Sequence, residues 1–345
     1  MNLDNFLKES EIIDFSHPTI QKLSQELAKD SKNDEQIAKN CFLYVRDNIN
    51  HSGDFKDDIT TCKASDVLKY KTGWCYAKSH LLAALLRANG IPTGFCYQRL
   101  SCGEYKDEVY CLHGLNAIYL KDYGWYRVDA RGNKKGVDAQ FNPLFEKLAF
   151  ELGKNEFDLP DIYDKPLDIV VESLNKYKTY DEMIGNFPDV SFLIIDYDKK
   201  YLKQIVELFI NTVHNINKKD YSKEQLNVWA NPYYDLEIWE KRFEKNKPCL
   251  CILKDKVVGF CEYYDGYIDC FYVHYKYQNF GIGKLLLNYI FKIAKNENID
   301  KIILDSSITA KSFFEEFGFK QIKENLVKKD NVELVNFSME REILL

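Results

Sequence analysis

The first half of the chain contains one run in which apolar residues recur at helical spacing. The run begins at Cys75, and its apolar positions are Ala77, Leu81, Ala84, Leu85 and Ala88. This spacing predicts an amphipathic helix, and Gly90 and Pro92 predict where it ends. Cys75 therefore lies in the predicted first turn, where unpaired backbone N–H groups and the positive end of the helix dipole favour a thiolate. Gly73 permits close backbone approach just before it.

The stretch LHGLNAIYLKDYGWYRVDARGN changes to a pattern typical of strands and predicts a β-hairpin. HGLNAIYL and WYRVDA are strand-like, and KDYG between them is turn-like. If the loop has five residues, Tyr119 opposes Trp125. Asp129 then opposes Leu115, one diagonal step from His113 and on the same face. An even-numbered loop would put His113 and Asp129 on opposite faces, so their proximity is a prediction of register.

A second strand-to-helix pattern, YIDCFYVHYKYQNFGIGKLLLNYIFKIAKN, lies in the second half of the chain. Its strand ends near Val273, a glycine-bearing turn follows, and the helix has an apolar face made of Ile282, Leu285, Leu286, Tyr289, Ile290 and Ile293. Backbone N–H groups at such a helix start can bind the oxygens of a pyrophosphate. The glycine spacing fits neither a Walker A loop nor the GxGxxG fingerprint. Downstream, KIILD predicts a strand, TAKSFFEEF a helix and ELVNFSMER a strand.

The sequence predicts a domain boundary between these two patterns. Helical and strand patterns alternate from about residue 15 to residue 171, and a new series starts at Ser191 with SFLIIDYD. Between them, NKYKTYDEMIGNFPD is polar, contains Gly185 and Pro188, and lacks a sustained apolar period. A chain of 345 residues is long enough for two hydrophobic cores. We therefore expect two domains, residues 1–180 and residues 190–345.

The amino-acid composition limits the classes of partner that we expect for this protein. With 46% hydrophobic residues, 29% charged residues and a net charge of −6, the chain has the composition of a soluble globular protein and gives no reason to expect a nucleic-acid partner. The sequence does not start with the basic segment and following apolar segment that are typical of a secretion signal. No apolar run reaches membrane-spanning length. We therefore expect a cytoplasmic protein without a membrane partner. The ten cysteines form no CxxC pair and no zinc-like cluster, which predicts mostly free thiols and no metal.

Cys75, His113 and Asp129 have the residue types of a thiol nucleophile, its base and the group that orients the base. The segment GWCYA at Cys75, the helix end LLRANGIP, and the hairpin with His113 and Asp129 resemble the transglutaminase-like superfamily of papain-type thiol enzymes. The phrases GFCYQRL, LHGLNAIYL and VDARGN resemble a compact bacterial branch of it. The likeness covers about residues 12–172.

That resemblance implies an α+β fold in which Cys75 lies on a central helix packed against an antiparallel sheet. It also implies a catalytic triad of Cys75, His113 and Asp129, which would carry out transamidation, peptide or amide hydrolysis, or deamidation through a thioester. Some members of the superfamily have lost catalysis. The alternative is therefore that the first domain only binds a peptide or amine substrate.

In an active site of this kind, the backbone N–H of Cys75 is the natural first donor to the oxyanion, and no second donor is assigned. Gln98 is better explained as a strand residue near the site. His80 falls within the predicted helix, more than a turn beyond Cys75, and has no neighbouring acid. His17 and His51 lie in turn-like or linker-like sequence and have no predicted role.

In the second half, the glycine-bearing turn is similar to the Q/R-x-x-G-x-G/A motif of the GNAT acyltransferases, and the likeness extends over about residues 191–342. It implies an α/β fold with a mixed, mostly antiparallel sheet, acetyl-CoA as cosubstrate, and direct attack by a neutral amine of a small molecule, peptide or protein. The helical DYSKEQLNVWANP region would form part of the acceptor-binding wall. The resemblance assigns Phe271, Tyr272 and Val273 to the pantetheine arm, and Gln278, Asn279, Phe280, Gly281, Ile282, Gly283 and Lys284 to the pyrophosphate.

The second half departs from the GNAT pattern at Phe314, which stands where a tyrosine often protonates the departing thiolate. Another tyrosine or water would then serve. The general base is also open, because Glu262 and Asp269 lie on predicted strands and are better explained as solvated or hydrogen-bonded carboxylates. His214 and His274 have no partner that the sequence identifies. The whole sequence thus predicts an enzyme with two acyl-transfer sites.

Overall fold

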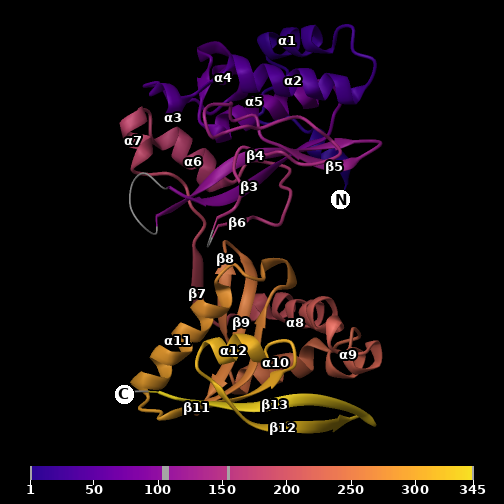
Figure 1. Cartoon of the computed structure of the whole chain (residues 1–345), viewed down its shortest axis with the longest axis vertical. Helices are drawn as coiled ribbons and strands as arrows, with labels where there is room; N and C mark the ends of the chain where they lie inside the picture. Colours follow the sequence, from indigo (N-terminus) through magenta and orange to yellow (C-terminus); the bar gives the residue numbers. More distant parts are fainter. Residues whose placement is uncertain (1, 103–108, 154–155, 344–345) are drawn as a thin grey trace. The chain divides into compact units, whose positions relative to one another are not determined.

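The computed structural model describes residues 2–102, 109–153 and 156–343. The chain folds into two compact units, Met1–Val190 and Ser191–Leu345, each with its own helices and its own main sheet (Figure 1). Within the described ranges, no helix is both long and apolar enough to cross a membrane. All ten cysteines are free thiols, which confirms the prediction from their spacing.

The N-terminal unit packs helices against a four-stranded antiparallel sheet of order β5-β4-β3-β6. A short parallel pair, β1 and β2, lies outside this sheet. The strands are β1 (Asn50–His51), β2 (Thr72–Gly73), β3 (Thr93–Ser101), β4 (Tyr110–Leu120), β5 (Gly124–Val128) and β6 (Phe157–Asp158). The helices are α1 (Pro18–Ala28), α2 (Asp34–Asn48), α3 (Ser52–Phe55), α4 (Ala64–Tyr70), α5 (Cys75–Ala88), α6 (Asp168–Lys176) and α7 (Tyr180–Ile184), preceded by a 3₁₀ turn over Leu3–Leu7.

Helix α5 is the centre of this unit, because α1, α2, α4, β3 and β4 all contact it. It starts at Cys75 and ends at Ala88, as the sequence predicts. It is not amphipathic, however, since every residue from Cys75 to Arg87 is buried. Its polar side chains bond inside the protein instead: the Arg87 guanidinium donates to the Thr93 carbonyl oxygen at 2.6 and 3.1 Å. The apolar spacing therefore identified the helix but not the layer that covers its polar side.

The β4–β5 hairpin has the predicted register. Tyr119 pairs with Trp125, although the turn holds three residues rather than five. Val128 ends β5, so the next residue, Asp129, lies one diagonal step from His113 on the same face. His113 does not open its strand, because β4 begins three residues earlier. The histidine is therefore held within a paired stretch of the sheet.

Gly114, next to His113, allows α5 to approach β4 closely. A Cβ at Gly114 would lie 2.9 Å from Cδ1 and 3.1 Å from Cα of Tyr76, the residue that follows Cys75. The Tyr76 hydroxyl donates to the carbonyl oxygen of Leu112 in the same strand. The start of α5 is therefore fixed against β4 beside His113.

The C-terminal unit contains a seven-stranded sheet of order β12-β13-β11-β10-β9-β8-β7. All neighbouring strands are antiparallel except β10 and β11, so the sheet is mixed and mostly antiparallel, as predicted. The strands are β7 (Phe192–Asp196), β8 (Cys249–Leu253), β9 (Lys256–Tyr264), β10 (Tyr267–Val273), β11 (Lys301–Ser307), β12 (Lys320–Lys329) and β13 (Val332–Glu342). The helices are α8 (Leu202–Ile216), α9 (Lys223–Trp229), α10 (Leu236–Lys245), α11 (Ile282–Asn296) and α12 (Lys311–Glu316), with 3₁₀ turns over Lys199–Tyr201, Asn217–Lys219 and Tyr275–Tyr277.

Helices cover both faces of this sheet. Apolar residues of α8 and α10, such as Phe209 and Phe243, pack with Phe260 of β9 in one buried cluster. The neighbouring residue on β9, Gly259, faces α11 instead, where a Cβ would lie 2.8 Å from Ile282. Successive strand residues point to opposite faces, so α8 and α11 lie on opposite sides of the sheet.

Strands β10 and β11 diverge soon after they pair. Only Tyr267 and Ile268 of β10 pair with β11, opposite Ile303 and Leu304. β10 then continues along β9 to Val273, and β11 continues along β13. Among the residues that the structure describes, the divergence leaves one edge of β10 without a strand partner, directly before the turn that leads into α11.

Candidate active sites

The thiol of Cys75 lies at the start of α5 beside His113. The backbone N–H of Gly114 donates to Sγ of Cys75 at 3.4 Å, and the thiol is also a hydrogen-bonding partner of the His113 ring. The residue before the helix, Trp74, has no side-chain capping bond, and the first intrahelical bond runs from the Lys78 N–H to the Trp74 carbonyl. The backbone N–H groups of the first turn can therefore serve an anion next to the thiol.

His113 joins Cys75 to Asp129. Its Nε2–H donates to Oδ2 of Asp129 at 2.7 Å, which leaves Nδ1 for the thiol. Burial opposes protonation of this ring, but the charge of Asp129 and of the Cys75 thiolate outweighs burial and raises the pKa of His113 to about 10. Phe150 shields the ring edge-on, with 5.0 Å between the ring centroids. The geometry thus brings together all three residues that the sequence singled out.

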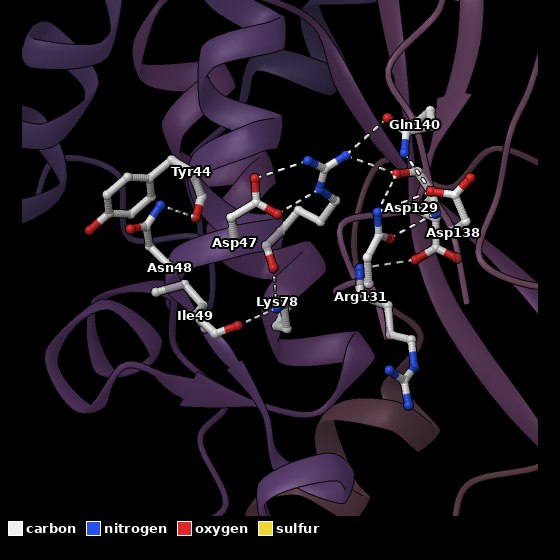
Figure 2. A network of polar contacts seen from close by, with 12 residues as sticks. Tyr44, Asp47, Asn48, Ile49, Lys78, Asp129, Arg131, Asp138 and Gln140 are labelled. Atoms are coloured by element: carbon white, nitrogen blue, oxygen red, sulfur yellow. Dashed lines mark hydrogen bonds and ion pairs between the residues drawn. The ribbon is translucent and has the colours of Figure 1, made fainter. Parts of the chain in front are cut away.

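Asp129 is fully buried and held by the backbone as well as by His113. Its Oδ2 also accepts from the Ala149 N–H at 3.1 Å. Its Oδ1 accepts from the Arg131 N–H at 3.1 Å, a contact shown in Figure 2. Burial favours the neutral acid, but the His113 charge and these hydrogen bonds lower the pKa of Asp129 below its ordinary value. The carboxylate therefore stays ionised and fixes the orientation of the imidazole.

Lys78, one turn along α5 from Cys75, is a buried charged residue that the helical pattern did not single out. Its Nζ donates to the carbonyl oxygens of Ile49 and, at 3.4 Å, of Arg46 at the end of α2 (Figure 2). Burial and the nearby Arg131 lower the pKa of Lys78 to about 7, and Asp129 opposes that change. Lys78 therefore joins α2 to the helix that carries Cys75.

A cavity of about 320 Å³ opens onto the thiol. Aromatic side chains, among them Trp74, Phe150 and Phe187, form much of its wall. Cys75, His51, His113 and Arg131 also line it. The Arg131 guanidinium points away from Asp129 (Figure 2). It donates to Asp54 at 2.5 and 2.9 Å. No local pattern predicts a role for His51 or Arg131, because the fold brings them into the same cavity as Cys75 from distant segments.

The other sequence candidates of this unit have structural partners. Gln98 pairs with His113 across β3 and β4, but its amide donates to Asp158 at 3.0 Å, and it does not line the cavity. His80 is buried, and its Nδ1 lies 2.8 Å from the Cys62 carbonyl oxygen. Burial lowers the pKa of His80 to about 4. His17 caps the start of α1.

The C-terminal unit has a larger cavity, of about 640 Å³, between the diverging ends of β10 and β11 and the turn before α11. It is lined by nine of the ten residues that the family motif singled out: Phe271, Tyr272, Val273, Gln278, Asn279, Gly281, Ile282, Gly283 and Lys284. Phe280 does not line it, and its ring packs against Tyr277 at 5.4 Å between centroids.

The turn before α11 has the backbone shape that an anion site requires. Gly281 has φ +77°, a conformation that side chains rarely adopt, and it precedes α11 without a side-chain capping bond. The first N–H groups of α11 are therefore available to an anion. The Gln278 side chain has a different task, since its amide donates to the Val273 carbonyl oxygen at 2.6 Å and fastens the turn to the end of β10.

The structure also shows the surroundings of the residues considered as acid and base in the C-terminal unit. Phe314 is buried, and its ring lies against Phe271 at 5.4 Å between centroids. Glu262 and Asp269 both pair with Arg242, at 2.7 and 2.8 Å, and only Asp269 lines the cavity. Burial raises the pKa of Glu262, against the effect of Arg242.

One tyrosine hydroxyl of the cavity wall is held by a tryptophan. The Tyr272 hydroxyl accepts from Nε1 of Trp229 at 3.2 Å, and burial raises the pKa of that tyrosine. The histidines of this unit have partners that the sequence did not identify: His214 Nε2 lies 2.8 Å from the Ala230 carbonyl oxygen, and His274 accepts from the Lys276 N–H at 3.1 Å.

Two family models match the chain, one within each compact unit. A family model for the transglutaminase-like superfamily matches residues 21–130, and a model for the GNAT acetyltransferase domain matches residues 217–341. The uncharacterized N-acetyltransferase YafP of Escherichia coli K12 is 30% identical over 146 residues, which are 42% of this chain and 93% of YafP.

Solved structures also resemble part of the chain. A GCN5-related N-acetyltransferase from Rhodopseudomonas palustris is 24% identical, with 45% of this chain and 98% of that one covered at a TM-score of 0.43. The PaiA N-acetyltransferase of Thermoplasma acidophilum, in complex with coenzyme A, is 21% identical, with 44% and 99% covered at a TM-score of 0.36. The match to YafP, at 30% identity over 93% of its length, shows that the chain belongs to the GNAT N-acetyltransferase family, and the two family models show that it carries a transglutaminase-like domain ahead of its GNAT domain.

Proposed function

We propose that the C-terminal unit transfers an acetyl group from acetyl-CoA to an amine of a small molecule, peptide or protein. The observation that carries this proposal is the 640 Å³ cavity, which extends from the diverging ends of β10 and β11 to the turn before α11. Membership of the GNAT family supports an acetyl thioester as the donor.

The residues present fit coenzyme A. Beyond Ile268, the free edge of β10 leaves backbone groups for the amides of an extended pantetheine arm, in the way that a strand edge receives a peptide. Gly281 and the uncapped start of α11 supply N–H groups for the pyrophosphate, and Lys284 adds a positive charge in the first turn. Gln278 supports this site indirectly, by fixing the turn to Val273.

Acetyl-CoA, when bound, supplies an activated acetyl group with a thiolate as leaving group. Among the described residues, Asp269 and Asp305 are the two carboxylates in the cavity wall. Asp269 is paired with Arg242, and its second oxygen suits an incoming ammonium group that must lose a proton before attack. Tyr272 takes the role that Phe314 cannot fill: burial keeps its hydroxyl protonated, and Trp229 holds that oxygen in place. We assign proton donation to the departing thiolate to this hydroxyl.

The test is calorimetric binding of acetyl-CoA to the whole chain and to Gly281→Ala. A methyl group at Gly281 strains the turn, and we expect the affinity to fall at least tenfold. Gly124→Ala is the matched control, because Gly124 has a similar φ of +74° and equally open surroundings in the N-terminal unit. Absence of acetyl-CoA binding to the unaltered chain, or equal binding by both variants, would contradict this assignment.

For the N-terminal unit we propose a thiol acyltransferase or amide hydrolase, on the specific observation that His113 lies between Asp129 and Cys75. His113 takes the thiol proton, and the thiolate forms a bond to the carbonyl carbon of an amide. The intermediate expels the amine, which takes the proton from His113, and a thioester remains on Cys75. Water or a second amine then releases the acyl group and regenerates the thiol.

The alternative is a binding module whose thiol is unreactive. Incubation of the chain with p-nitrophenyl acetate, followed by peptide mapping, separates these readings. We expect the acetyl group to appear first on Cys75, and Cys75→Ala to lose the rapid release of p-nitrophenolate. Acetylation spread over the thiols without preference for Cys75 would leave the GNAT domain as the catalytic part of the chain.

A further inference from the structure

His51 lies beside Cys75 because two distant segments pair. β1 and β2 are parallel, with His51 opposite Gly73 in the register. Gly73 stands two residues before Cys75, so the backbone of His51 is fixed to the segment that begins α5. The His51 ring lines the same cavity as Cys75 and His113. Two histidines therefore adjoin the space where an acyl group would react.

Packing holds the His51 ring in place, but one of its nitrogens lacks a hydrogen-bond partner in the part of the chain that the structure describes. It packs edge-on against Trp74, with 5.7 Å between the ring centroids, and only 9% of the residue is exposed. Gly53 leaves room for the ring, since a Cβ there would lie 3.1 Å from its Cε1 atom. Nδ1 is buried and has no hydrogen-bond partner among the described residues.

The nearest acid does not satisfy this ring. Oδ2 of Asp54 lies 3.9 Å from Nδ1, and Asp54 already accepts from Arg131 at 2.5 and 2.9 Å and from Lys134 at 2.5 Å. Burial, together with repulsion by Arg131, holds the pKa of His51 well below its ordinary value, although Asp54 acts in the other direction. The ring is therefore neutral, with one N–H to donate.

Nδ1 faces Gly53 and Asp54, so a hydrogen-bond acceptor bound in the cavity would meet the other ring nitrogen, Nε2, which is not among the buried atoms without a partner. The thiol reaction creates such an acceptor. When the Cys75 thiolate forms its bond to the carbonyl carbon, the π electron pair moves to the carbonyl oxygen, and the oxyanion needs fixed donors. The backbone N–H of Cys75 at the start of α5 supplies the first of them.

We propose that Nε2–H of the neutral His51 ring is the second donor to the oxyanion formed at Cys75. This assignment rests on the proposed thiol function of the N-terminal unit. His51 keeps its proton throughout: the oxyanion collapses, the leaving group departs, and the proton that leaves with it comes from His113. His51 thus stabilises the intermediate while His113 moves the proton.

Two reagents, used on the whole chain, distinguish stabilisation of the oxyanion by His51 from proton transfer by His113. Iodoacetamide alkylates a thiolate by displacement at carbon, without an oxyanion, whereas p-nitrophenyl acetate acylates it through an oxyanion. Both rates are measured at Cys75 by peptide mapping. We expect His51→Ala to slow acylation about 10²- to 10³-fold, as loss of one oxyanion donor does, and to leave alkylation unchanged. His51→Gln keeps an N–H donor and should recover part of the acylation rate.

His17→Ala, at the cap of α1, is the control that should change neither rate. Equal slowing of both reactions by His51→Ala and His51→Gln would overturn the proposal, because it would mean that His51 only supports the fold or the thiolate. Unchanged acylation in both variants would also overturn it. If His51→Ala fails to fold, His51→Gln decides. If Cys75 in the unaltered chain reacts no faster than in His113→Ala, the thiol function fails, and the role of His51 falls with it.

Discussion

Replacing Asp129 with asparagine removes the charge that keeps His113 protonated while changing little else in shape. Three donors converge on this buried carboxylate: His113 Nε2 at 2.7 Å and the N–H groups of Ala149 and Arg131, each at 3.1 Å. Asparagine offers one oxygen and one NH₂ group. At least one of the three donors therefore loses its acceptor.

The cost has two parts. One buried N–H without an acceptor costs roughly 1–3 kcal/mol. The second part depends on pH, because the pKa of His113 is about 10 in the folded protein and near 6.5 when unfolded. A raised pKa stabilises the folded state fully below about pH 6.5, and this contribution is lost as the pH rises through about 10. Without Asp129 the contribution disappears, so the destabilisation should be largest near pH 6 and smaller near pH 10.

The assay is calorimetric thermal unfolding of the whole chain over this pH range, together with the alkylation rate of Cys75. We expect alkylation near neutral pH to fall about 10²-fold or more, since the imidazolium no longer supports the thiolate. Asp138→Asn is the control, because Asp138 is an exposed member of the same polar network (Figure 2). A variant at Asp129 that unfolds at the same temperature near pH 6, or that is alkylated at an unchanged rate, would refute the reasoning.

Three further changes test other parts of the account. Burial lowers the pKa of Lys78 to about 7, so this residue makes the free energy of unfolding rise with pH between about 7 and 10.5. Lys78→Met should remove this rise, and the melting temperature of the variant should then fall more steeply above about pH 7 than that of the unaltered chain. Gly114→Ala places a methyl group against Tyr76 and should destabilise the N-terminal unit by about 1–3 kcal/mol and slow alkylation of Cys75, as calorimetry and labelling will measure. Tyr272→Phe should lower kcat for acetyl transfer about tenfold or more with little change in the KM for acetyl-CoA, and unaltered kcat would exclude its hydroxyl as the proton donor.

Local spacing was enough to predict the elements that carry the candidate site. The helix start at Cys75 follows from apolar positions a few residues apart, and the register of Asp129 with His113 follows from one short turn. The glycine-bearing turn before α11 was predictable for the same reason, because strand, turn and helix are consecutive in the chain. Interactions over short sequence distances decide each of these features.

Other features depend on segments that are distant in sequence. His51 reaches Cys75 through a two-residue parallel pairing with Gly73, which has no strand-like pattern of its own. Lys78 is buried because α2 covers the side of α5 that a helical pattern assigns to solvent. β12 was missed because its sequence, KQIKENLVKK, is polar and mostly exposed, so it shows no alternation of apolar and polar positions.

The most direct test of the account is the rate of iodoacetamide labelling at each of the ten cysteines, from mildly acidic to alkaline pH, with His113→Ala alongside. Burial raises the pKa of Cys41 and Cys96 to about 12, so these thiols should label slowly. The half-buried Cys102 is a stringent reference, because a hydrogen bond with Cys111 lowers its pKa. We expect Cys75 to label fastest at mildly acidic pH, and we expect loss of His113 to remove this advantage. Labelling of Cys75 no faster than Cys102, with or without His113, would contradict it.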